Sequence, residues 1–297
     1  MPKIKINDIS MYYEIHGAGE PLVLIAGFGS DHTVWDWVVE QFKEQYKVIL
    51  FDNRGAGQTD VAEGPYTLEQ MMGDIVALCS ELDIDKAHFI GNSLGGFILQ
   101  ALAFHHPDLV KSAIINNSAL QIAGPFQIYL QAQLAFLKAE VPLIPLIKAS
   151  CCWAFSYHFL SQPGMLDMLV KRTLENPYPF TIQGYEGQYA VVEQFDARTW
   201  AGKIKVPTLV LASDQDLICR EQLAKQPEEY IPGATYHCFS ECGHLPQIEY
   251  PDEFARVVLK FLLSCSRITG SDSHEKSLTV ARDDVISRNY YYCKANK

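Results

Sequence analysis

The stretch FIGNSLGGF, residues 89–97, holds Ser93 among glycines at the end of an apolar run. Residues 87–90 indicate a short buried strand, and residues 94–103 are apolar at helical spacing. A strand that turns so tightly into a helix needs glycine wherever a side chain would collide, as at positions 91, 95 and 96. Such a turn lifts the serine hydroxyl above the sheet edge, beside a positive helix N-terminus. A phosphate-binding loop is the alternative, and it fails because no Gly-Lys-Ser/Thr follows.

Short buried strands alternate with helical stretches on both sides of this turn. We expect strands near residues 3–9, 11–16, 22–26, 48–51, 87–90, 110–115, 207–212 and 234–239, and helices near 33–44, 67–82, 93–105, 220–229 and 251–263. This alternation predicts an α/β fold with a mostly parallel, doubly wound sheet. Residues 120–204 are helical, aromatic and rich in proline. We therefore predict a core of residues 1–119 and 205–264, a helical cap inserted at 120–204, and a flexible C-terminal tail at 265–297.

Composition limits the class of protein and its partners. A chain of 297 residues with 48% hydrophobic and 20% charged residues is typical of a globular protein. A net charge of −11 without a basic stripe argues against a nucleic-acid partner. We find no signal peptide and no apolar run of the roughly 20 residues that a membrane span requires, so we expect a cytoplasmic protein with no membrane span.

The eight cysteines form no disulfide framework of the kind seen in small secreted domains. One cluster, His237, Cys238, Cys242 and His244, raises the possibility of zinc. Its spacing is poor, because the first two members are neighbours on an expected strand and point to opposite faces. We therefore expect no metal and no cofactor.

Ser93 becomes a nucleophile only when a base takes its proton, so a histidine is required. Of the nine histidines, His244 follows the last expected strand, in a loop anchored by the helix near 251–263, and we expect it to be the base. A carboxylate must orient that base. Asp214 and Asp216 both follow the preceding strand. Because Asp214 is placed to cap its own turn, we favour Asp216.

The order Ser93, Asp216, His244 and its flanking motifs resemble the α/β-hydrolase family over about residues 2–264. The motifs are GNSLGG (91–96), DNRGAGQTD (52–60), SDQD (213–216) and G-H-x4-E-x-P-x2-F (243–254). Within that family the chain is similar to small-ester and lactone hydrolases of the 3-oxoadipate enol-lactonase and pimeloyl-carrier methyl ester esterase type. The strand expected at 110–115, which precedes the strand before Asp214, is followed by Asn-Asn-Ser at 116–118, which offers no carboxylate.

The resemblance implies an oxyanion hole made by the backbone N–H groups of Phe28 and Leu94. Many relatives have His-Gly before the first of these loops, where this chain has Ala-Gly at 26–27. We therefore expect other contacts to hold the Phe28 loop. We take Arg54 and Asp60 as braces of the neighbouring loop.

The predicted function is hydrolysis of a small carboxylic ester, thioester or lactone through an acyl-enzyme on Ser93, with a small molecule as substrate. C–C bond hydrolases, peroxidases and lyases use the same triad on this fold, and a slow-turnover ligand receptor would also keep it, so these remain alternatives. Candidate substrate-binding residues are Trp153, Phe155 and Phe159, for which packing of the cap onto the core is an equal explanation. Candidate cap cations for a carboxylate-bearing lactone are Lys148, Lys171 and Arg172.

Overall fold

The computed structural model describes residues 3–122 and 124–269. In this part of the chain, eight strands form one sheet in the order β1-β2-β4-β3-β5-β6-β7-β8. Their bounds are β1 Lys3–Ile6, β2 Ile9–His16, β3 Glu20–Ile25, β4 Tyr46–Phe51, β5 Ala87–Asn92, β6 Val110–Asn116, β7 Thr208–Ser213 and β8 Thr235–Phe239. The first two strands pair antiparallel and the other six run parallel, which confirms the predicted sheet.

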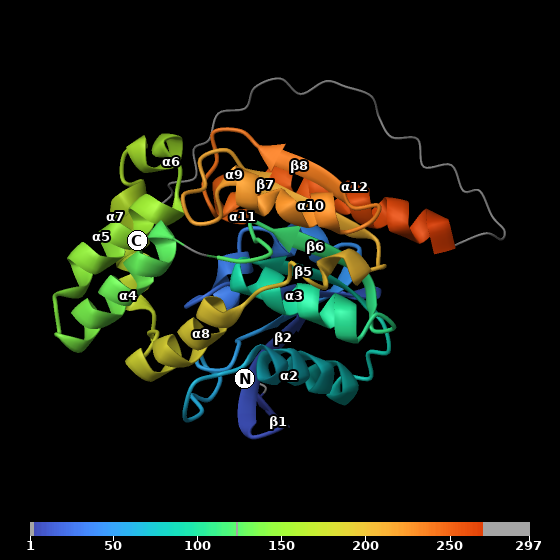
Figure 1. Cartoon of the computed structure of the whole chain (residues 1–297), viewed down its shortest axis with the longest axis horizontal. Coiled ribbons are helices and arrows are strands. Elements are labelled where there is room, and N and C mark those ends of the chain that lie inside the picture. Colours follow the sequence, from blue (N-terminus) through green and yellow to red (C-terminus); the bar gives the residue numbers. More distant parts are fainter. Residues whose placement is uncertain (1–2, 123, 270–297) are drawn as a thin grey trace, which may run out of the picture.

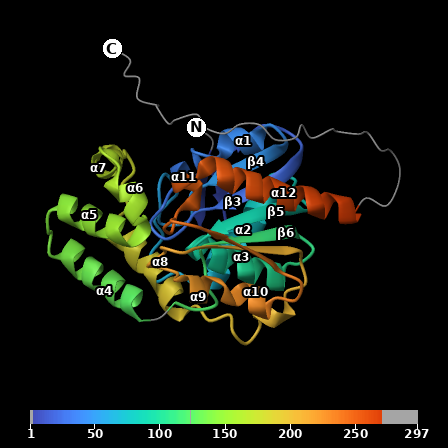
Figure 2. The same cartoon turned by 90° about the horizontal axis from the view of Figure 1, so that it is seen from above.

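Helices cover both faces of the sheet (Figures 1 and 2). One face carries α1 (Val39–Lys43) and α12 (Pro251–Thr269), and the other carries α2 (Leu68–Glu81), α3 (Leu94–His105), α9 (Glu221–Ala224) and α10 (Gln226–Tyr230). Strand β3 shows why its sequence is apolar throughout. Val23 and Ile25 pack beneath α2 and α3, whereas Leu22 and Leu24 pack beneath α1 and α12. A strand buried on both faces has no polar side to alternate with.

A helical insertion separates β6 from β7. It consists of α4 (Pro125–Lys138), α5 (Leu143–Ala154), α6 (Tyr157–Ser161), α7 (Met165–Glu175) and α8 (Ile182–Gln194), and a short turn, η2 (Ala201–Lys203), follows. Helices α4 to α7 stand together beyond one end of the sheet, while α8 runs against the core (Figures 1 and 2). These helices confirm the helical pattern of this segment. Their role as a cap over a site remains a prediction.

Three expected elements differ from the structure, and one of them, the helix expected near 220–229, consists of the two short helices α9 and α10. The single helix expected over 33–44 is a 3-10 turn, η1 (His32–Trp35), followed by the short α1. In an α-helix the Thr33 carbonyl would accept from the N–H four residues further along the chain. Here it accepts instead from Asp36 N at 3.2 Å, which is the 3-10 pattern, and from the Arg172 side chain of α7 at 2.9 Å.

Helix α12 runs to Thr269, past the expected boundary at residue 264. The buried series Phe254, Val258, Leu262 and Cys265 explains the extension, because its spacing keeps one face of the helix on the sheet. Residues 270–297 of the predicted tail lie outside the described residues. Among the helices that the structure describes, none has the length and apolar character needed to cross a membrane.

Candidate active site

Ser93 lies on the sharp turn between β5 and α3, with φ 55° and ψ −116°. A residue other than glycine rarely adopts a positive φ, and such strain gathers at functional sites. The surrounding glycines permit close packing. A Cβ on Gly91 would lie 2.2 Å from the Gly95 carbonyl oxygen, and a Cβ on Gly95 would lie 2.2 Å from the Ile25 carbonyl oxygen. The tight strand-to-helix turn predicted from these glycines is confirmed.

The side chains of Asp216 and His244 are in direct contact. Oδ2 of Asp216 lies 2.7 Å from Nδ1 of His244, and both residues are buried. Oδ1 of Asp216 accepts from the backbone N–H groups of Ile218 at 2.8 Å and Cys219 at 2.9 Å. Because an ionised carboxylate only accepts, Nδ1 of His244 donates and Nε2 is left as the basic nitrogen. Asp214, the other candidate acid, instead accepts from the loop that follows β8.

Asn117 supports this acid, and the sequence analysis missed that role. Its Nδ2 lies 2.9 Å from Asp216 Oδ2, 2.9 Å from Ser213 Oγ and 3.3 Å from the Gly243 carbonyl oxygen. Asn117 also has a φ of 43°, a conformation that asparagine adopts more readily than most residues. An asparagine directly after a buried strand was the available signal. From the sequence we inferred only that this position offers no carboxylate.

The loop that carries His244 lies beside the Ser93 turn. The His244 carbonyl oxygen is 3.5 Å from Nδ2 of Asn92, the residue before Ser93. Ser93 Oγ has no hydrogen-bond partner among the residues that the structure describes. Catalytic hydrogen bonds often tighten only when substrate is bound, so an Oγ to Nε2 bond belongs to the mechanism that we propose below.

Two backbone N–H groups beside Ser93 are also unused. Within the described chain, neither the Phe28 nor the Leu94 amide donates to a protein acceptor. Leu94 is the first residue of α3, where helix geometry leaves amides without intrahelical partners. The Phe28 loop touches the serine, because a Cβ on Gly27 would lie 3.2 Å from Ser93 Cβ. Both amides therefore belong to segments that adjoin Ser93, and neither is used by a protein acceptor in the described chain.

The helical insertion holds the loop of His244. The His244 N–H donates to the Ala154 carbonyl oxygen, at the end of α5, at 2.7 Å. Glu249, in α11 (Pro246–Glu249), accepts from the N–H of Gly243 and the N–H of Ser156, each at 3.0 Å, and from Ser156 Oγ at 2.5 Å. Burial raises the pKa of Glu249 above its ordinary value, although these donors oppose the rise. These bonds hold the backbone of the His244 loop against the backbone of the insertion at Ala154 and Ser156.

The three aromatic residues expected to bind substrate occupy two places in the insertion. Phe155 and Phe159 stack with their ring centroids 5.0 Å apart, and they are buried in a cluster that includes Leu245, next to His244. They pack the insertion onto the His244 loop. Trp153 is half-buried and stacks on Tyr129 of α4, with ring centroids 5.1 Å apart.

Other aromatic rings surround Phe28. Phe180 and Tyr185 meet the Phe28 ring edge to face, at centroid distances of 5.5 and 4.7 Å. The sequence analysis did not select either residue, because no local pattern distinguishes them from the other aromatics of the insertion. Of the expected cations, Lys148 and Lys171 are exposed, and Arg172 binds Asp36 at 2.6 Å.

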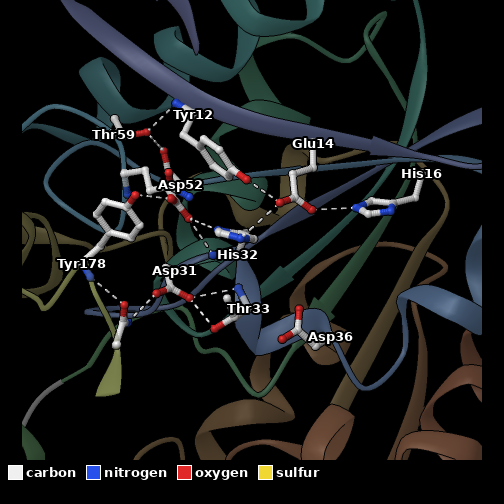
Figure 3. A network of polar contacts seen from close by, with 12 residues as sticks. Tyr12, Glu14, His16, Asp31, His32, Thr33, Asp36, Asp52, Thr59 and Tyr178 are labelled. Atoms are coloured by element: carbon white, nitrogen blue, oxygen red, sulfur yellow. Dashed lines mark hydrogen bonds and ion pairs between the residues drawn. The ribbon is translucent and has the colours of Figure 1, made fainter. Parts of the chain in front are cut away.

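A polar network braces the Phe28 loop (Figure 3). The backbone N–H and Nδ1 of His32 lie 2.7 and 2.8 Å from the same oxygen of Asp52, at the end of β4, and Nε2 of His32 lies 3.5 Å from Glu14 of β2. Burial lowers the pKa of His32, but the Asp52 and Glu14 carboxylates outweigh burial and raise it above its ordinary value. Asn53 Nδ2 also donates to the Ala26 carbonyl oxygen at 3.0 Å. These contacts hold the loop that lacks the histidine of many relatives.

Arg54 and Asp60 brace the neighbouring loop, as expected. The buried Arg54 guanidinium binds the two oxygens of Asp74 at 2.7 and 2.9 Å, and it binds Asp8 at 3.0 Å. Asp60 accepts from Ser10 N at 2.8 Å.

One group of described residues brings possible metal ligands within 4.8 Å of one another, namely Asp216, Cys219 and His244. The Asp216 oxygens already accept four hydrogen bonds, from Ile218, Cys219, Asn117 and His244. Burial raises the pKa of Cys219 well above its ordinary value and so disfavours the thiolate that a metal needs. This donor set does not fit a metal ion. The sequence cluster at 237–244 forms no such group among the described residues.

Comparison with known proteins shows the family to which the chain belongs. The model of the alpha/beta hydrolase fold family matches residues 20–251, and the chain belongs to this family of enzymes. The chain is 27% identical to 3-oxoadipate enol-lactonase 2 of Acinetobacter baylyi, over 85% of this chain and 92% of that protein. It is 26% identical to a proline iminopeptidase of Lacticaseibacillus rhamnosus, over 86% and 95% of the two chains. The crystal structure of an enol-lactonase from Burkholderia xenovorans LB400 superposes with a TM-score of 0.80 at 28% identity, covering 88% of this chain and 100% of that one.

Proposed function

We propose that this protein is a serine hydrolase that cleaves a small carboxylic ester, thioester or lactone through an acyl-enzyme on Ser93. The observation that carries the proposal is the buried contact of 2.7 Å between Asp216 and His244, in a loop beside the strained Ser93 turn. The similarity to two enol-lactonases supports a carboxylic ester bond as the target.

Acylation begins when Ser93 Oγ attacks the carbonyl carbon of the substrate. The hydroxyl proton passes to His244 Nε2, and Asp216 stabilises the imidazolium that forms. The electron pair of the carbonyl moves onto its oxygen, which accepts hydrogen bonds from the Phe28 and Leu94 amides. Each such donor stabilises the transition state by about 3 kcal/mol.

Collapse of this intermediate breaks the bond to the leaving oxygen or sulfur, which takes the proton from His244. In a lactone the leaving oxygen stays attached to the acyl chain. Water then attacks the acyl-enzyme and gives its proton to His244, and a second oxyanion collapses to release the carboxylic acid. The proton returns to Ser93 Oγ, so the cycle needs no cofactor.

The acyl group lies beneath the helical insertion, which acts as the cap. The rings of Phe28, Phe180 and Tyr185 favour an apolar acyl chain, and the positions of the three cap cations give no support to a substrate with a free carboxylate. A panel of p-nitrophenyl esters of increasing acyl length measures this preference.

Replacement of the nucleophile tests the proposal. We expect Ser93→Ala to lose p-nitrophenyl ester hydrolysis by about 10⁴-fold or more and to lose labelling by a fluorophosphonate. Ser80→Ala, on the exposed side of α2, is the matched control and keeps both. Unchanged turnover by Ser93→Ala would overturn the proposal.

A further inference from the structure

Gln188 is a fully buried polar residue of α8, far from the catalytic residues in sequence. Both ends of its side-chain amide are used. Oε1 accepts from the backbone N–H of Gly29 at 2.9 Å, and Nε2 donates to the Arg54 carbonyl oxygen at 3.0 Å. Gly29 follows Phe28, whose own amide we assign to the oxyanion hole. We infer that Gln188 is a positioning residue through which the helical insertion sets the orientation of that oxyanion-hole loop, an inference that rests on the proposed function.

The loop that Gln188 contacts is a turn with two accessible forms. Ser30 N donates to the Gly27 carbonyl oxygen at 3.2 Å, which closes a four-residue turn, and Gly29 has a φ of 66°. A positive φ at the third residue defines a type II turn, and a flip of the central peptide converts it into type I. Glycine tolerates both forms. The central peptide here joins Phe28 to Gly29, and its N–H is the group that Gln188 Oε1 binds, so Gln188 selects one form.

Gln188 is itself held in place by close packing of α8 on the core. A Cβ on Gly184 would lie 2.1 Å from the Gly55 carbonyl oxygen, and a Cβ on Gly187 would lie 2.5 Å from the Tyr66 ring. These glycines bring the helix backbone directly against the Arg54 segment. The Oε1 atom of Gln188, which accepts from Gly29 N, therefore has a fixed position relative to the sheet, as a positioning residue requires.

Loss of this contact removes the one protein acceptor of a partly buried peptide. Without Oε1, the Gly29 N–H would have no acceptor among the described residues, and the peptide would turn toward water. Such a flip rotates ψ of Phe28 and φ of Gly29 and removes the constraint on Phe28, whose ring packs edge-on against Phe180 and Tyr185. The expected result is a weaker oxyanion hole with an unchanged serine, histidine and aspartate.

Gln188→Met tests the inference, because methionine has similar length and no group to accept or donate. We expect kcat to fall about 10- to 100-fold with KM within about threefold of the original value. An alkylboronic acid, which adds to Ser93 and places an oxygen in the hole, should bind more weakly by a similar factor. Gln183→Met, on the exposed side of the same helix, is the control and changes neither quantity. A loss confined to KM, or unchanged boronic acid affinity, would overturn the inference.

Gln188→Glu provides a second test of the inference, which does not depend on the folding of Gln188→Met. A glutamate side chain accepts from Gly29 N in either protonation state, although it donates to the Arg54 carbonyl only when protonated. Its boronic acid affinity should therefore stay closer to that of the parent protein than the affinity expected of Gln188→Met, and a loss equal to the one expected of Gln188→Met would contradict the inference. The Ser93→Ala variant separates the two hypotheses. If it still hydrolyses esters, the proposed function fails, whereas if it is inactive and Gln188→Met is fully active, only the role of Gln188 fails.

Discussion

Replacement of Asn117 by glycine is the most direct test of how the acid of the site is held. Glycine removes the side-chain amide but adopts the φ of 43° without strain. Asp216 then loses one of its donors, and Ser213 Oγ loses a partner at 2.9 Å. Because all three residues are buried, water does not readily replace these contacts.

The magnitude follows from the bonds removed. A hydrogen bond to a charged group contributes about 1.5–3 kcal/mol, and a neutral one contributes about 1 kcal/mol. With the added entropy of glycine in the unfolded chain, we expect the free energy of unfolding to decrease by about 3–5 kcal/mol. Asn117→Ala should cost about 1 kcal/mol more, because alanine resists the left-handed conformation. We also expect kcat/KM to fall by about tenfold, since the carboxylate that orients His244 is held less firmly.

Urea unfolding followed by tryptophan fluorescence measures the change in stability. Asn7→Gly is the matched control, because Asn7 has a φ of 50° and one bond of 2.9 Å to Asp74 but is exposed. Because Asn7 is exposed and water replaces its bond to Asp74, its loss should be about 1–2 kcal/mol, in large part the entropy of glycine. If Asn117→Gly loses no more stability than Asn7→Gly, the assigned support of Asp216 by Asn117 is wrong.

Two further perturbations test the braces around the site. Asp74→Ala leaves Asp8 as the only carboxylate partner of the buried Arg54 guanidinium among the described residues, so we expect a loss of about 3–5 kcal/mol in the free energy of unfolding, measured by urea titration. The Asp52 and Glu14 carboxylates raise the folded-state pKa of His32 above its unfolded value of about 6.5. Protonated His32 therefore stabilises the fold fully below that unfolded value. The stabilisation is lost as the pH rises through the folded-state pKa. His32→Asn should therefore lower Tm more at pH 6 than at pH 9, and an equal decrease at both would contradict the assignment.

Local features were the most predictable from sequence. The Ser93 turn depends on glycines within a few residues of the serine, and the buried strands are continuous apolar runs. The choice of Asp216 over Asp214 depended on position within one turn, and the structure puts Asp216 against His244. Each of these inferences needed only neighbours in the chain.

Contacts between distant segments were not predictable in the same way. Gln188 and Gly29 are 159 residues apart, and nothing in the sequence of α8 distinguishes Gln188 from an exposed helical glutamine. Phe155 and Phe159 resemble pocket residues in the sequence, yet they pack against the segment that follows His244. Burial and partner identity depend on how α8 and α5 dock on the core. A periodicity of 3.6 residues does not specify that docking.

The attachment of the insertion at two points bears on how substrate preference can be exchanged between members of the family. Ala154 and Ser156 secure the His244 loop, and Gln188 secures the Phe28 loop. A chimera that replaces everything between β6 and β7 would remove both attachments together. Grafts confined to α4 and α7 leave both attachments native, so crossovers on either side of these two helices exchange part of the insertion while the His244 and Phe28 loops keep their own supports.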